Sequence, residues 1–340
     1  MNIKMLMNFN LMLFMFMMIL SILIGINSNS VIYFWISIEI NMISFISLMV
    51  FNNKIYNDSF MKYFLIQSIS SSIMLMLSLM IYLNSLNVYM YMILVMFMKM
   101  GMFPFLYWYI DILNNLSWMN CLILMTIQKI LIFFFLSNLI MNFWMMMENN
   151  IMLIYMMILM NMIFSLMFLY NNNSMKVLMS CSSLNQMGWL IYMIFLSFKI
   201  WLYYYMYYMW LLILILMLFN INKILYLKNL YNLEFLIKMI LFFLMMLMMS
   251  IPPLIMFYLK SFSTMIILSN MMIFINYMMI LVSVMYMYYY MKIFISSMIF
   301  NSYIYLMNIM WVKLNKLSIN YFILWIFILF IYMIYWVILI

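Results

Sequence analysis

Short polar stretches divide the chain into a series of continuous apolar runs, each about 20 residues long. As a helix, a run of this length crosses the roughly 30 Å hydrocarbon core of a bilayer. The runs lack the alternation of a half-buried strand, and 73% of all residues are hydrophobic against 6% charged. Because backbone polar groups in lipid must be hydrogen-bonded within the protein, the pattern predicts an all-α polytopic membrane protein.

We expect about eleven transmembrane helices in a single domain covering residues 1–340. The predicted spans are 5–26, 31–51, 60–83, 87–108, 119–141, 150–170, 177–197, 200–221, 236–268, 271–292 and 320–340. The first run is interpreted as a span and not as a removed signal peptide, since no small-residue cleavage site follows it. The largest predicted loops, 222–235 and 293–319, leave no room for a soluble enzyme domain.

The lysines predict the orientation of these spans. If the N-terminus defines side one, the alternating loops place only Lys199 on side two. Side one collects Lys4, Lys54, Lys62, Lys176, Lys223, Lys228, Lys238, Lys292, Lys313 and Lys316. Cytoplasmic or matrix loops carry such an excess, so the N-terminus lies inside and the C-terminus outside. This asymmetry explains most of the net charge of +9 without a nucleic-acid partner, and it makes phospholipids such as cardiolipin candidate partners.

Missing residue types exclude several kinds of chemistry. The sequence contains no His, so it offers no imidazole for haem, copper or zinc. Two cysteines, Cys121 and Cys181, cannot hold an iron–sulfur cluster, and no glycine-rich phosphate loop exists among three isolated glycines. We therefore expect no redox cofactor or metal in this chain. The 56 methionines, with many Phe and Tyr and no Ala or Arg, indicate A/T-rich coding of the animal mitochondrial type.

Four ionisable residues lie deep within predicted spans: Glu39, Lys99, Lys129 and Lys260. A charge at the bilayer centre costs about 2.5–3.5 kcal/mol on insertion scales, so each of them requires an explanation. A structural ion pair is one explanation, and snorkelling to the interface is another, most easily for Lys260. One acid for three lysines leaves two lysines unpaired, however, and burial favours the neutral form of an unpaired lysine. We interpret the four as a proton relay along the bilayer midplane.

Two of the predicted spans carry helix-breaking residues. Gly101 and Pro104 follow Lys99, and Pro104 lacks an N–H and clashes with the carbonyl of the preceding turn. In the ninth span, Pro252-Pro253 precedes Lys260 by about two turns, and 33 residues would rise about 50 Å as a straight helix. We interpret both spans as single broken crossings. Paired interrupted helices favour a pseudo-inverted repeat of the antiporter type, with sites at the midplane.

Several stretches together are similar to one known family. They are 35–41 (WISIEIN) with Ser44-Phe45, 62–68 (KYFLIQS), 99–105 (KMGMFPF), 128–130 (QKI), 182–189 (SSLNQMGW) and 252–254 (PPL) leading to Lys260. The sequence resembles the chain 2 family of mitochondrial NADH–ubiquinone oxidoreductase, which are antiporter-like membrane subunits of respiratory complex I. The A/T bias favours an arthropod member. The first break departs from the family pattern, because Phe103 replaces a small residue and no histidine follows Pro104.

The resemblance implies a core subunit in the proton-pumping membrane arm of complex I, in the mitochondrial inner membrane. The N-terminus would lie in the matrix and the C-terminus in the intermembrane space. Glu39 would pair with Lys99, Lys129 would connect onward, and Lys260 would lead to a neighbouring membrane-arm subunit. Flavin, iron–sulfur clusters and quinone would belong to other subunits. Two alternatives stay open: a stand-alone cation/proton antiporter, and a structural assembly subunit whose buried charges are inert.

Overall fold

The computed structural model describes residues 2–52, 58–80, 86–143, 151–170, 172–231, 233–251, 254–267 and 273–305. Within these ranges the chain forms helices and no β-strand, apart from an isolated bridge between Ser174 and Tyr226. Seven helical segments are long and apolar enough to cross a membrane. They are Phe9–Ile26, Val31–Phe51, Ser59–Met80, Trp118–Met141, Met152–Tyr170, Phe198–Ile221 and Ile273–Ser297. The predicted all-helical, polytopic fold is thus confirmed.

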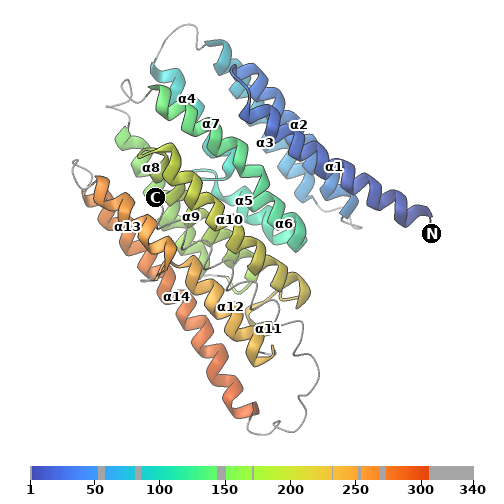
Figure 1. Ribbon diagram of the computed structural model, residues 1–340, viewed down its shortest axis with the longest axis vertical. Helices are drawn as coiled ribbons and strands as arrows, with labels where there is room; N and C mark the ends of the chain where they lie inside the picture. The colour runs from blue at the N-terminus through green and yellow to red at the C-terminus, as the bar shows by residue number, and fades with distance from the viewer. Residues whose placement is uncertain are drawn as a thin grey trace.

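The helices follow the predicted apolar runs closely. The first part of the chain contains α1 (Asn2–Ile26), α2 (Val31–Asn52), α3 (Ser59–Met80), α4 (Leu86–Met100), α5 (Leu106–Asn115), α6 (Trp118–Met125) and α7 (Ile127–Phe143). The second part contains α8 (Ile151–Tyr170), α9 (Met175–Ile194), α10 (Phe198–Ile221), α11 (Leu227–Tyr231), α12 (Phe235–Met248), α13 (Ile255–Ile267) and α14 (Ile273–Tyr305). Figure 1 shows α1–α3 at one end of the bundle and α12–α14 at the other, with α7, α9 and α10 between them.

Helix α9 lies at the centre of the bundle. Every residue from Val177 to Ile194 is buried, and the helix packs against α5, α7, α8 and α10. Because protein covers it on all sides, its polar residues need not face lipid. These are Ser180, Ser182, Ser183, Asn185 and Gln186. The predicted span at 177–197 is therefore a core helix with a polar stretch and not one of the seven most apolar segments.

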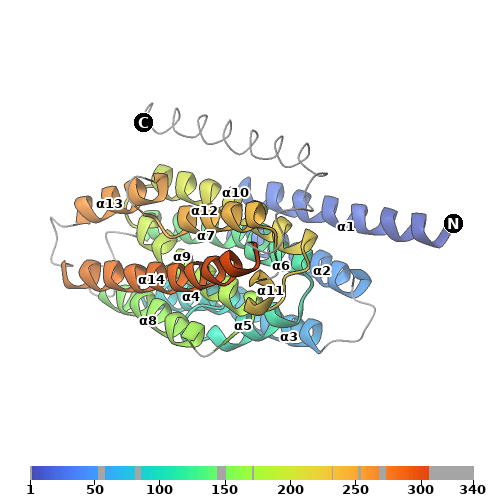
Figure 2. The same ribbon diagram turned by 90° about the horizontal axis from the view of Figure 1, so that it is seen from below.

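Helix α1 shows the opposite pattern. Its apolar side chains lie largely on the surface, as for Phe9, Met12 and Phe16. Figure 2 shows the helix along one edge of the bundle, with its N-terminus pointing away from it. In a membrane protein such a surface faces lipid tails, which are as apolar as the side chains themselves. The exposed apolar surface of α1 is consequently that of a peripheral transmembrane helix.

Three details differ from the sequence-based expectations. The predicted fifth span is divided into α6 and α7 at Thr126, whose φ of −117° and ψ of −86° are not helical; no glycine or proline marks this interruption. The short helix α11 lies in the predicted loop 222–235. The expected loop 293–319 begins as helix, because α14 continues to Tyr305 through a stretch without Gly or Pro. The predicted span 320–340, and Pro252 and Pro253, lie outside the described residues.

Lys238, one of the lysines that the sequence assigns to side one, is buried near the beginning of α12. It lies one turn inside α12 and is 1% exposed. Its Nζ donates to the backbone carbonyls of Tyr231 at 2.8 Å and Ser297 at 3.3 Å. Buried ammonium groups need acceptors of this kind, so Lys238 ties α11 and α14 to α12.

Candidate functional site

The chain leaves helical geometry between Met100 and Leu106, directly after Lys99. Gly101 turns the chain with a φ of +71°, a conformation that side chains with a Cβ rarely adopt. A Cβ on Gly101 would also lie 2.4 Å from Cβ of Tyr109 on α5. Glycine at this position therefore makes the turn possible and lets α5 pack closely against it.

Three side chains bind the backbone groups that this interruption frees. Gln67 Nε2 donates to the carbonyl of Lys99 at 3.0 Å, and Trp108 Nε1 donates to the carbonyl of Met98 at 3.1 Å. The N–H of Phe103 donates to Asn161 Oδ1 at 3.2 Å. Irregular backbone at membrane depth is tolerated only where protein satisfies it in this way. None of these three side chains is among the predicted site residues, although Gln67 belongs to the stretch 62–68 that carries the family resemblance.

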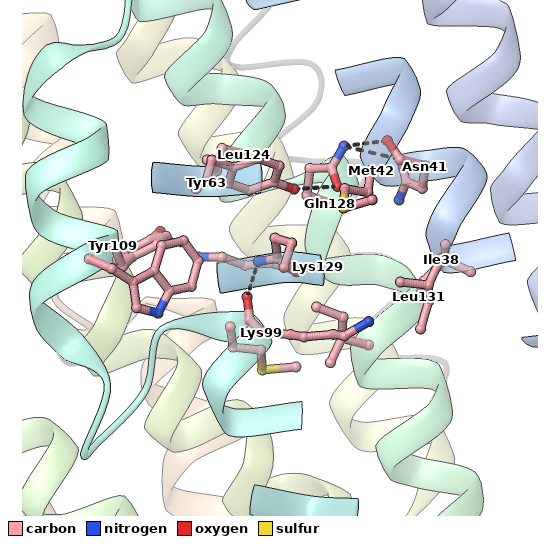
Figure 3. A pocket seen from close by; sticks show the side chains of 14 residues that line it. Ile38, Asn41, Met42, Tyr63, Lys99, Tyr109, Leu124, Gln128, Lys129 and Leu131 are labelled. Atoms are coloured by element: carbon pink, nitrogen blue, oxygen red, sulfur yellow. Dashed lines mark hydrogen bonds between the residues drawn. The ribbon is translucent and has the colours of Figure 1, made fainter. Parts of the chain in front are cut away.

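Lys99 and Lys129 line the same buried cavity, which has a volume of about 30 Å³. Figure 3 shows their side chains entering it from α4 and α7. The polar groups around them are Asn41, Tyr63, Gln67, Tyr109 and Gln128. This volume is enough for about two water molecules by the usual measure of roughly 10–15 Å³ each. We call this group of residues the Lys99–Lys129 site.

Among the residues that the structure describes, no acid lines the Lys99–Lys129 site. Lys99 is 2% exposed, and its Nζ has no hydrogen-bond partner in the part of the chain that the structure describes. Glu39 lies half-buried on α2, and its charge attracts Lys99 without an ion pair within 4.0 Å. The ion pair found among the described residues joins Lys62 and Asp111 on the exposed surface at 2.6 Å. The structure thus places Glu39 near Lys99 but not in direct contact with it.

Hydrogen bonds between side chains connect α2 to the same site. Gln128 Nε2 donates to Asn41 Oδ1 at 3.0 Å, and the Tyr63 hydroxyl donates to Gln128 Oε1 at 3.3 Å (Figure 3). In the sequence, Asn41 comes two residues after the predicted site residue Glu39, and Gln128 directly precedes Lys129. Their hydrogen bond fixes α2 against α7 at the level of the cavity.

Lys129 is also 2% exposed, but its ammonium is bound. Its Nζ donates to the Tyr109 hydroxyl at 2.5 Å and lies 4.4 Å from the centre of the Tyr109 ring. Tyr109 is hydrogen-bonded in turn to Ser183 Oγ at 2.8 Å. Lys129 is therefore connected to the central helix α9 through a residue that sequence reasoning missed, because Tyr109 stands in an aromatic-rich stretch without a recognisable motif.

Lys260 occupies a corresponding position in the second part of the chain. It lies on α13 and is 6% exposed. Its Nζ donates to Ser250 Oγ at 2.9 Å and lies 5.0 Å from the centre of the Trp189 ring. Ser250, which has a φ of +58°, belongs to the segment that leaves α12. Gln186 on α9 donates to the carbonyl of Met248 at the end of α12, at 2.7 Å. We call Lys260 with Ser250 and Trp189 the Lys260 site.

Helix α9 contacts both sites. Ser183 reaches the Lys99–Lys129 site through Tyr109, whereas Trp189 belongs to the Lys260 site and Gln186 binds the end of α12 next to it. Ser183 and Gln186 are about one helical turn apart and lie on the same side of α9. This is the architecture of an ion-handling membrane protein of the antiporter type, in which buried charges stand beside interrupted helices.

Comparison with known proteins defines the family. Residues 28–287 match the family model described as NADH:quinone oxidoreductase/Mrp antiporter, TM. The matched range includes all four predicted relay residues and both predicted broken spans. The chain belongs to this family of membrane proteins.

Curated relatives carry one name. The proteins named NADH-ubiquinone oxidoreductase chain 2 from Anopheles gambiae and Aedes aegypti are 32% and 43% identical to this chain over 176 residues. Each match covers 48% of this chain and 49% of the relative. The namesake from Locusta migratoria is 29% identical over 165 residues. The matches thus span about half the length of these insect proteins.

Solved structures share the fold. A chain of respiratory complex I from Thermus thermophilus with bound aureothin superposes with a TM-score of 0.75 at 14% identity, covering 85% of this chain and 70% of that chain. A chain of the Mrp complex from Dietzia sp. DQ12-45-1b gives a TM-score of 0.69 at 12% identity, covering 82% of this chain and 58% of that chain. At these identities the likeness concerns the fold alone.

Proposed function

We propose that this chain is a core membrane-arm subunit of the proton-pumping NADH:ubiquinone oxidoreductase of the mitochondrial inner membrane. One observation carries the proposal: Lys99 and Lys129 share a buried cavity without an acid, and Lys129 is hydrogen-bonded towards the centre of the bundle. A buried ammonium without a counter-ion pays a desolvation cost of several kcal/mol. A lysine in such a place gains from exchanging its proton with a neighbour, and this is what a relay requires.

The relay would consist of Glu39, Lys99, Lys129 and Lys260. Glu39 would modulate Lys99 from α2, Lys129 would take the proton towards α9, and Lys260 would pass it on beyond this chain. The names of the insect relatives support the placement in complex I. Flavin, iron–sulfur clusters and quinone would be held by other subunits, so this chain would contribute proton translocation to the NADH:ubiquinone reductase reaction without a redox centre. Conformational and electrostatic coupling would link proton translocation in this chain to quinone reduction in the other subunits.

We further propose the topology that this function needs. The chain would form one antiporter-like domain over residues 1–340 with eleven crossings, in which α4 with α5 and α12 with α13 are two broken crossings of a pseudo-inverted repeat. The interruptions after Met100 and Met248 support it. The N-terminus would lie in the matrix and the C-terminus in the intermembrane space. Other membrane-arm subunits and phospholipids such as cardiolipin would be the partners.

A stand-alone cation/proton antiporter is the second candidate, and the fold shared with a chain of the Mrp complex is what keeps it in view. A native gel of mildly solubilised membranes, stained for NADH dehydrogenase activity, separates the two when this chain is located by peptide mass spectrometry. We expect it in the very large NADH-oxidising band. Migration alone or as a small oligomer would favour the antiporter.

The relay itself is tested by Lys99→Met, with Lys199→Met at an exposed position of α10 as the matched control. We expect Lys99→Met to assemble and oxidise NADH while its proton yield per electron falls strongly, because the substitution keeps the bulk of the side chain and removes its titratable group. A normal proton yield in the assembled variant would support inert buried charges and overturn the proposal.

A further inference from the structure

Tyr109 is the most unusual neighbour of the proposed relay. It is 0% exposed, comes from the short helix α5, and contacts two different helices through a single oxygen atom. Lys129 on α7 lies on one side of that oxygen at 2.5 Å, and Ser183 on α9 lies on the other at 2.8 Å. The Tyr109 hydroxyl is thus the hydrogen-bonded connection between the Lys99–Lys129 site and the central helix.

The direction of these hydrogen bonds follows from which groups can donate and which can accept. An ammonium group can only donate hydrogen bonds, so the Tyr109 oxygen accepts from Lys129. The Ser183 hydroxyl donates to the carbonyl of Ser180 at 2.8 Å, so its oxygen is left to accept from Tyr109. The hydrogen bonds therefore run one way, from Lys129 through Tyr109 and Ser183 to a backbone carbonyl of α9.

This direction depends on the proton of Lys129. A neutral amine has a lone pair and can accept a hydrogen bond, which an ammonium cannot. When Lys129 gives up its proton, the Tyr109 O–H becomes free to turn from Ser183 towards Lys129. A rotation of one hydroxyl would then transmit the charge state of Lys129 to α9, the helix that also contacts the Lys260 site through Gln186 and Trp189.

We propose that Tyr109 is a positioning residue for Lys129, which holds the protonated form of that lysine and couples its charge state to helix α9. This inference rests on the proposed relay and names a residue beyond its four members. The close approach of α5 to the helix interruption at Gly101 places the ring, and the edge-on contact with Trp108 supports it.

Tyr109→Phe removes the hydroxyl and keeps the ring. Tyr107→Phe is the matched control, because Tyr107 lies two residues away on α5, is 71% exposed and packs edge-on against Phe168 with a ring that the substitution keeps. Proton translocation coupled to NADH oxidation is measured against pH in vesicles containing the assembled complex. Loss of a hydrogen bond to the ammonium favours the neutral amine by roughly tenfold, so the profile of Tyr109→Phe should shift by about one pH unit towards acid.

Other ionisable groups lie near Lys129 or its neighbours and stay unchanged in both variants. Lys99 and Tyr63 line the same cavity, and Glu39 on α2 acts on Lys99. Cys121, Cys181 and Tyr208 interact with Tyr109, and the Tyr205 hydroxyl donates to the carbonyl of Thr126. Because the two phenylalanine variants share this background, a shift confined to Tyr109→Phe reports on the missing hydroxyl.

Lys129→Met is included to separate this inference from the proposed function. If Lys129→Met pumps normally, the relay itself fails. If Lys129→Met loses pumping while Tyr109→Phe matches Tyr107→Phe at every pH, the relay stands and the role of Tyr109 is overturned.

If Tyr109→Phe does not assemble, Ser183→Ala tests the proposal instead. Its control is Ser182→Ala, on the same buried stretch of α9. We expect a smaller acid shift for Ser183→Ala, since the Tyr109 O–H loses its acceptor, and no shift for Ser182→Ala. Equal profiles for the two serine variants would overturn the proposal. Where Tyr109→Phe does assemble, the double variant should shift no further than Tyr109→Phe alone, because the two groups act in series.

Discussion

The two lysine sites of this bundle are built from the same parts but differ in enclosure. Around Lys99 and Lys129, residues of α2–α7 surround a cavity of about 30 Å³. Lys260 faces a cavity of about 380 Å³ whose wall includes Ser261, Ser283 and the exposed Phe257. The first site lies inside the bundle, whereas α13 and α14 form its far edge (Figure 1).

The two sites also differ in the groups that contact each lysine. At the first site, polar side chains are directed at the helix interruption and at Lys129, and Lys99 Nζ is left without a hydrogen bond in the described structure. At the second site, Lys260 has both a hydroxyl and an aromatic face. The first pair of lysines is thus surrounded by groups of this chain, whereas Lys260 lies beside a larger cavity lined by residues of α13 and α14.

The largest effect should come from Gly101→Ala, which attacks the first site directly. A residue with a Cβ at a φ of +71° costs about 1–3 kcal/mol, and the new Cβ would overlap the Tyr109 Cβ. We expect little of the variant in the assembled NADH-oxidising band of a native gel. In the control Gly188→Ala, on a regular helix, the added Cβ would lie 2.9 Å from Cγ of Met162 and in ordinary contact with Ile158, so only a shift of the Met162 side chain is needed and a smaller loss is expected. Equal assembly of both variants would show that the turn at Gly101 is not constrained.

The next largest effect should be a difference in heat stability between the variants Lys99→Met and Lys260→Met. Lys99→Met removes an ammonium without a hydrogen-bond partner and should stabilise the assembled protein by about 1 kcal/mol or more, because an unsatisfied buried polar group is costly. Lys260→Met also removes a hydrogen bond and a cation–π contact, so its stability should stay near that of the unaltered chain. The measurement is the fraction of intact complex after graded heating. If Lys260→Met stabilises more than Lys99→Met, the contrast between the sites is wrong.

A smaller and more local difference should appear in thiol labelling. Ser283→Cys places a thiol in the wall of the large cavity beside Lys260, and Met42→Cys places one in the wall of the small cavity beside Lys99. Since a buried thiol reacts only during local opening, the labelling rate at position 283 should exceed that at position 42 on the order of 10-fold or more. The native Cys121 and Cys181 are both buried and give little background. Similar labelling rates would show that the two cavities are equally accessible, which would contradict the comparison.

The smallest effect is expected from Asp111→Asn, which opens the exposed ion pair with Lys62. Solvent screens such pairs, and many contribute nothing measurable to stability. Assembly and proton yield should both equal those of the unaltered chain. A loss of proton yield comparable to that of Lys99→Met would instead make this surface pair part of the first site.

Most of the fold could be predicted because long apolar runs and their breakers are local signals. The expected spans reproduce α1, α2 and α8–α10 within a few residues, and the interruption after Lys99 lies where Gly101 and Pro104 indicated it. The interruption at Thr126 escaped prediction, because no breaker residue marks it. The Thr126 carbonyl accepts a hydrogen bond from the Tyr205 hydroxyl of α10 at 2.7 Å, a contact that depends on how two distant helices pack.

The sequence by itself determined the class of protein and the surplus of lysines over acids, since hydropathy and composition set these directly. Only the tertiary structure decided which groups meet. Tyr109, Trp108 and Ser250 became partners of the site because helix rotation and close packing aim their polar atoms at Lys129, at the carbonyl of Met98 and at Lys260. A hydrogen bond needs its two atoms within about 3 Å of each other, and pairs of residues that come from different helices acquire that precision only when the bundle is packed.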